Sequence, residues 1–129
     1  MADRSRDWFL QAERDLEHAE DCLCAGRHEW ACFVAQQAAE KSITALHLRL
    51  GQEAWGHVVA RLVAELPATH QPFRELIDKA KVLDAFYIPT RYPNGHPEGA
   101  PFENYGPLQS GEAIRYAREI IEFVRPRLA

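Results

Sequence analysis

The stretch CFVAQQAAEK at residues 32–41 lies in the middle of a segment, residues 28–50, that contains no proline or glycine. Its small residues permit close approach of neighbouring helices, and its Gln, Glu and Lys side chains bring polar groups to the same level. Gly51 follows the segment, and glycine favours the end of a helix. The pattern therefore predicts one long helix with a polar centre, packed closely against its neighbours.

Apolar or small residues recur at helical spacing in four other segments. Pro67 ends the shortest of them, and Ser110 is a suitable N-cap for the last one. No segment shows sustained alternation of apolar and polar residues, so strands are not expected. The sequence predicts an all-α fold, an antiparallel up-and-down bundle of four principal helices plus a short extra helix. The four segments are residues 3–25, the short 57–66, 72–89, and a final helix that starts near Ser110.

The chain has 129 residues, of which 47% are hydrophobic and 26% are charged, and we expect a single domain over residues 1–129. The net charge is −4, and residues 1–26 account for all of it. This charge excludes nucleic-acid binding driven by bulk positive charge. No run approaches the roughly 18 apolar residues that span a bilayer, so we expect a cytoplasmic protein without a membrane partner.

Residues 90–109 contain four prolines and three glycines, which predicts a long loop between the last two helices. Such loops are often functional. Arg91 and His96 near its start carry groups suited to phosphoryl chemistry. A histidine can accept a proton from a ribose 2′-hydroxyl, while a guanidinium holds the phosphate, and neither step needs a metal ion. An alternative interpretation is that this segment is only a solvated loop.

Several of these features together resemble a prokaryotic HEPN domain. They are the Trp8 helix, the 32–41 block, Gly56-His57 ahead of an apolar helix, Tyr87, and Arg91-Tyr92-Pro93-Asn94. The resemblance covers nearly the whole chain. It implies an all-α bundle, often a homodimer, frequently encoded beside a minimal nucleotidyltransferase. Many HEPN proteins are metal-independent ribonucleases of toxin-antitoxin systems with an Arg-x4-6-His motif, and others are nucleotide or RNA binders without cleavage.

Arg91 and His96 match the spacing of that motif and are the catalytic candidates that the resemblance implies. In HEPN toxins a tyrosine stands two residues after the histidine, and here that position is Glu98. Tyr92, Asn94 and Tyr105 are further candidates for binding within or near the loop.

Gln37, Glu40 and Lys41 in the predicted second helix are candidate supporting residues. Gln37 and Lys41 share one helix face, as do Gln36 and Glu40, because residues four apart are neighbours on a helix. Polar groups in a helix centre need partners, and we expect one of them to contact the Arg91 loop or a second copy of the chain.

We expect no metal site and no cofactor. Cys22 and Cys24 point to opposite faces of a helix and cannot share one ion, and three crowded cysteines indicate reduced thiols. The large aromatic residues are expected mainly in the core, namely Trp8, Trp30, Phe33 and Phe86.

Two functional hypotheses remain. In the first, the Arg91 loop binds a nucleotide or RNA, with RNA cleavage included, and the protein acts with a nucleotidyltransferase partner. In the second, the bundle is a non-catalytic dimerisation and docking module, and Arg91 and Tyr92 anchor the loop onto the second helix.

Overall fold

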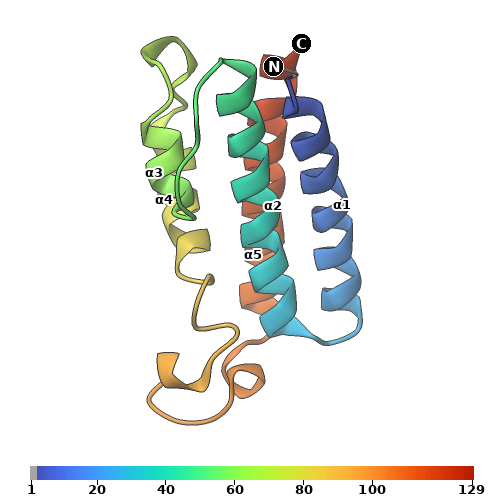
Figure 1. The fold of residues 1–129 in the computed structure, drawn as a ribbon. Helices are drawn as coiled ribbons and strands as arrows, with labels where there is room; N and C mark the ends of the chain where they lie inside the picture. Colours follow the sequence, from blue (N-terminus) through green and yellow to red (C-terminus); the bar gives the residue numbers. More distant parts are fainter. Residues whose placement is uncertain (1–2) are drawn as a thin grey trace.

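The computed structural model describes residues 3–129, and all regular elements within that range are helices (Figure 1). Five are α-helices and four are short 3-10 turns. The α-helices are α1 (Ser5–Cys24), α2 (His28–Arg49), α3 (Val59–Ala64), α4 (Arg74–Asp84) and α5 (Pro107–Val124). The 3-10 turns are η1 (Ala68–His70), η2 (Pro93–Gly95), η3 (Pro101–Asn104) and η4 (Arg125–Leu128).

The helices form an up-and-down bundle around α2 (Figure 1). α1 and α5 pack against α2, and the α3–α4 pair lies on its other side. The N-terminal end of α1 and the C-terminus lie at the same end of the bundle. The predicted all-α class and up-and-down arrangement are therefore confirmed.

Small side chains on α2 allow the neighbouring helices to pack closely around it. α2 buries a row of alanines together with Ile43 and Leu46, all fully inaccessible. Burial of apolar surface and close packing stabilise a core, and alanines let the helix axes approach. The alanines are Ala31, Ala35, Ala38, Ala39 and Ala45.

Glycines end the first two helices, as the sequence predicts. Gly26 and Gly51 have φ values of +76° and +74°. A side chain at either position would be strained by this left-handed conformation, although neither position is crowded. The chain can therefore reverse sharply between α1 and α2 and leave α2 towards α3.

Two predicted helix boundaries are wrong. α4 ends at Asp84, not near Pro89, and the chain then forms tight turns. α5 begins at Pro107, not near Ser110. Proline is well suited to the first helical position, and the Gln109 side chain accepts a hydrogen bond from the Gly106 N–H at 2.7 Å. Ser110 is buried and bonds His28 Nδ1 at 2.8 Å.

The expectation that Trp8 and Trp30 are core residues is also wrong. Their exposed fractions are 38% and 45%, whereas Phe9, the next residue after Trp8 in α1, is buried in the core. The buried face of α1 runs through Phe9, Ala12 and Ala19, so Trp8 lies at its edge. Phe33 and Phe86 are half-buried. Among residues 3–129, no helix has both the length and the apolar character to cross a membrane.

The three cysteines lie in different environments, which gives a first prediction. Burial raises the pKa of the Cys32 thiol to about 12, with the nearby Glu29 carboxylate adding to the effect, whereas Cys24 is exposed. Thiolates are the reactive form. We expect iodoacetamide at mildly alkaline pH to label Cys24 first and to leave Cys32 unlabelled until urea unfolds the chain. Peptide mass spectrometry measures this, and equal labelling of Cys24 and Cys32 in the native protein would contradict it.

Candidate functional site

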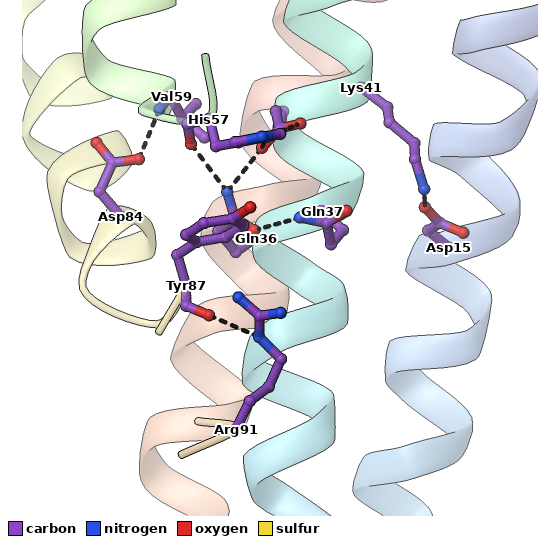
Figure 2. A network of polar contacts seen from close by, with 10 residues as sticks. Asp15, Gln36, Gln37, Lys41, His57, Val59, Asp84, Tyr87 and Arg91 are labelled. Atoms are coloured by element: carbon purple, nitrogen blue, oxygen red, sulfur yellow. Dashed lines mark hydrogen bonds and ion pairs between the residues drawn. The ribbon is translucent and has the colours of Figure 1, made fainter. Parts of the chain in front are cut away.

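The polar centre of α2 is the base of the candidate site (Figure 2). Gln36 is fully buried, and its Nε2 donates to Glu40 Oε1 at 3.2 Å and to the His57 backbone oxygen at 3.2 Å. Gln37 Nε2 donates to Gln36 Oε1 at 2.9 Å. The Gln36–Glu40 bond follows from the spacing of one helical turn. The bond from Gln36 to the His57 backbone connects α2 to the segment before α3. The buried amide of Gln36 is thus fully engaged.

Glu40 and His57 extend this hydrogen-bond network from Gln36 towards the surface. His57 Nδ1 lies 3.1 and 3.2 Å from the two carboxylate oxygens of Glu40. The Glu40 side chain is 10% exposed, whereas the His57 side chain is 59% exposed. The His57 ring stacks on Tyr87, with centroids 5.0 Å apart and an interplanar angle of 18°. One edge of the imidazole is therefore held by a buried carboxylate, while much of the ring remains open to solvent.

Asp84 fixes the backbone that carries His57. Its carboxylate oxygens accept hydrogen bonds from the Val59 N–H at 2.6 Å and the Ala60 N–H at 3.0 Å, so the end of α4 caps the start of α3. Burial raises the pKa of Asp84, and the two N–H groups oppose that rise. The negative charge of Glu40 adds to the rise. The buried carboxylate of Glu40 and the half-buried carboxylate of Asp84 thus both contact the segment that carries His57.

Arg91 lies on the opposite side of Tyr87 from His57 in Figure 2. Its Nε donates to the Tyr87 backbone oxygen at 2.9 Å. The guanidinium carbon lies 4.3 Å from the ring centroid of Phe33, 4.8 Å from that of Tyr87 and 5.2 Å from that of Tyr92. No carboxylate among residues 3–129 pairs with it. Aromatic faces hold the cation, and its terminal N–H groups stay available for an anion.

His96 is bound within its own loop and not to Arg91. Its Nε2 donates to the Pro89 carbonyl at 2.6 Å, which places the ring proton on Nε2, because a carbonyl only accepts. The Tyr105 ring meets it edge-on, with centroids 5.5 Å apart. Gly95 packs so closely that an added Cβ would lie 3.0 Å from Pro89 Cα. Burial raises the pKa of Tyr105. The loop is therefore packed around Pro89.

The remaining predicted residues are spread over different environments. Lys41 forms an ion pair with Asp15 of α1, away from Arg91 (Figure 2). Tyr92 is 48% exposed, and Asn94 is exposed in η2. Gln37 and Glu40 belong to the network. In the part of the chain that the structure describes, no hydrogen bond joins Gln37, Glu40 or Lys41 to residues 90–109. No hydrogen bond within residues 3–129 therefore joins them to the Arg91 loop, and the other expected contact, with a second copy of the chain, stays a prediction.

Phe33, His57 and Tyr87 are site residues that the sequence does not assign to the site: Phe33 is expected in the core, and His57 and Tyr87 contribute only to the family resemblance. Phe33 and Tyr87 follow ordinary helical stripes, and His57 precedes a helix. The Gln36–Glu40 spacing predicts their mutual bond. Stacking between residues far apart in the sequence leaves no local pattern, so only the fold reveals it. No cluster of three or more His, Cys, Asp or Glu side chains in residues 3–129 is arranged to hold a metal ion.

Comparisons with known proteins agree on one family. The HEPN domain family matches residues 5–127. TT1696 from Thermus thermophilus has 46% identity and a TM-score of 0.95, over 98% of this chain and 99% of that one. ST0689, an archaeal HEPN homologue, has 38% identity and a TM-score of 0.84 over 100% of both chains.

A third crystal structure is that of a HEPN domain protein, tm0613, from Thermotoga maritima. It has 35% identity and a TM-score of 0.75, over 93% of this chain and 95% of that one. No curated protein is significantly similar to this chain.

The cap made by Asp84 gives a second prediction. Asp84→Ala leaves two N–H groups of α3 without acceptors, and we expect it to lower the free energy of unfolding by about 1–2 kcal/mol. Asp78→Ala on the exposed face of α4 is the matched control and should change it by less than about 0.5 kcal/mol. Urea unfolding followed by circular dichroism measures both. Equal effects of the two substitutions would show that the cap does not hold α3.

Proposed function

Because the chain belongs to the HEPN domain family, we propose that it binds RNA or a nucleotide through a phosphate held by Arg91. The observation that carries this proposal is the set of contacts around the Arg91 guanidinium. Three aromatic rings and one backbone carbonyl position it, yet no carboxylate in the described residues neutralises it. A guanidinium matches the geometry of a phosphate, as it does that of a carboxylate, with two parallel hydrogen bonds.

The surroundings of Arg91 favour a nucleotide over a simple anion. Tyr92 is 48% exposed beside the guanidinium, and Trp30 is 45% exposed and meets Phe33 edge-on at 6.0 Å. Exposed aromatic rings next to a phosphate-binding cation give bases a surface on which to stack. The net charge of −4 means that attraction must come from this local arrangement and not from the charge of the whole chain.

Cleavage of RNA at the same place is a second candidate function. Two observations favour it: the His57 ring and the Arg91 guanidinium both lie against Tyr87, and His96 follows Arg91 at the Arg-x4-His spacing in the sequence. A histidine beside a bound phosphodiester can accept the proton of a 2′-hydroxyl without metal. The proposed partners are a second copy of the chain and a minimal nucleotidyltransferase.

Arg91→Ala tests the binding proposal. We expect its affinity for a single-stranded RNA 20-mer to fall by about 10- to 100-fold, the value of a lost charged hydrogen-bonding group. Arg91→Lys keeps the charge but loses the planar fork, and its affinity should fall between those of wild type and Arg91→Ala. Fluorescence anisotropy at two salt concentrations measures this, and Arg91→Ala should show the weaker salt dependence.

Arg115→Ala is the matched control, because Arg115 also lies over an aromatic ring, 5.3 Å from the Tyr116 centroid, and forms no ion pair in the described structure. It should bind RNA as wild type does. Equal losses in the Arg91 and Arg115 variants would contradict a specific phosphate site, and so would the absence of any effect of Arg91→Ala.

The proposed homodimer has its own measurement. Light scattering at tens of micromolar protein should give about twice the 14.7 kDa of one chain. A mass of one chain at that concentration would rule out the dimer and any site shared between two copies.

A further inference from the structure

A groove of about 920 Å³ opens beside the Glu40–His57 pair, between the start of α1, the C-terminal half of α2 and residues 51–57. Glu40 and His57 contribute to its lining, together with Trp8, Leu48, Arg49 and Trp55. Trp55 is 73% exposed, two residues before His57. The groove therefore combines an exposed aromatic surface with an ionisable pair, and it is large enough for part of a nucleotide chain.

The imidazole of His57 is arranged to exchange a proton at Nε2. Its Nδ1 faces both oxygens of Glu40, and a carboxylate only accepts, so Nδ1 carries the proton of the neutral ring. The lone pair is then on Nε2, which has no protein partner among residues 3–129. A buried carboxylate that orients a histidine in this way is the arrangement found in many acid–base sites.

Three contacts prevent the ring and its backbone from moving freely. Glu40 holds the Nδ1 edge, Tyr87 stacks on the ring face, and Gln36 Nε2 holds the backbone oxygen at 3.2 Å. His57 lies in the connection before α3, so these three contacts, and not a helix, must hold the geometry that proton transfer needs. The partly exposed ring is thus positioned before any ligand arrives.

His57 is also close to the proposed phosphate site. Its ring centroid and the Arg91 guanidinium carbon lie 5.0 and 4.8 Å from the centroid of the same Tyr87 ring, so they are no more than about 10 Å apart. Figure 2 shows Tyr87 between them. His96, in contrast, uses its Nε2 for the Pro89 carbonyl and has the Tyr105 ring against it.

We propose that His57, oriented by Glu40, is the catalytic proton acceptor for an RNA phosphodiester bound at Arg91. This inference rests on the proposed RNA binding. His57 Nε2 takes the proton of the ribose 2′-hydroxyl, the 2′-oxygen forms a bond to phosphorus, and the bond from phosphorus to the 5′-oxygen breaks. The same proton passes to the departing 5′-oxygen. The products are a 2′,3′-cyclic phosphate and a 5′-hydroxyl, and no other reactant is consumed.

Arg91 and Glu40 have different parts in this step. Arg91 stabilises the charge that develops on the non-bridging phosphate oxygens. Glu40 takes no part in the bonds that form or break and is a positioning residue: it keeps the proton on Nδ1 and balances the imidazolium that forms. DNA lacks the 2′-hydroxyl, so the reaction is specific for RNA.

The experiment uses the full chain, a single-stranded RNA 20-mer and EDTA. We expect wild type to leave 2′,3′-cyclic phosphate ends. His57→Ala should cleave about 100-fold more slowly or worse and keep RNA affinity within about threefold of wild type. Added imidazole should restore part of the lost rate, which a merely structural role of His57 would not allow. An RNA with one 2′-deoxy position should resist cleavage at that position.

Glu40→Gln separates positioning from folding. The amide retains an oxygen that can accept hydrogen bonds from Gln36 and His57, so the fold should persist, as urea unfolding checks. We expect kcat to fall by about tenfold with KM within about threefold of wild type. His70→Ala is the control variant and should retain the wild-type rate within about threefold. His96→Ala tests the competing candidate, and this inference expects it to lose much less activity than His57→Ala.

Each other outcome overturns a different claim. If wild type binds RNA through Arg91 but leaves it intact, or if His57→Ala cleaves as wild type does, the catalytic inference fails and the binding proposal stands. If His96→Ala alone abolishes cleavage, or if imidazole fails to restore any activity to His57→Ala, His57 is not the proton acceptor. If Arg91→Ala binds RNA as wild type does, both the proposed function and this inference fail.

Discussion

The buried amide of Gln36 constrains the arrangement of everything around it. A buried polar group without a partner costs about 1–3 kcal/mol, so the centre of α2 cannot face an apolar neighbour. Gln36 meets this requirement with Glu40 and with the backbone of His57. The segment that follows α2 must therefore return to the middle of that helix before α3 begins. Asp84 then fixes the beginning of α3 by accepting two backbone N–H groups.

Tyr87 extends this constraint from the helices to the loop. Its ring stacks on His57, and its backbone oxygen accepts the Nε proton of Arg91. A single residue just beyond α4 thus connects the polar centre of α2 with the first residues of the loop. Because the ring lies against both an imidazole and a guanidinium, movement of either group would disturb the packing of the other. The site is therefore built by elements that already stabilise the fold, and only the exposed atoms remain for a ligand.

The sequence predicts the helices well because their signals are local: the glycines after α1 and α2 and the spacing of apolar residues need no knowledge of the tertiary structure. The predicted start of α5 is wrong because two local signals compete there, since Pro107 and Ser110 both suit a helix start. Arg91 and Glu40 stand out in the same local way, by residue type and spacing. The contacts that join them run through Tyr87 and depend on how the segment before α3 returns to α2, which no local pattern encodes.

Charge explains why a phosphate site can exist on an acidic chain. The whole net charge of −4 is carried by residues 1–26. Cations of the other helices pair with three acidic residues of α1: Lys41 with Asp15, Arg118 with Glu20, and Arg125 with Glu13. Partly exposed pairs of this kind contribute at most about 1 kcal/mol each to stability. Their larger effect is on the local field, since each pair cancels a negative charge that would repel an approaching phosphate. Arg91 has no such partner in the described structure, so its charge is left for a ligand.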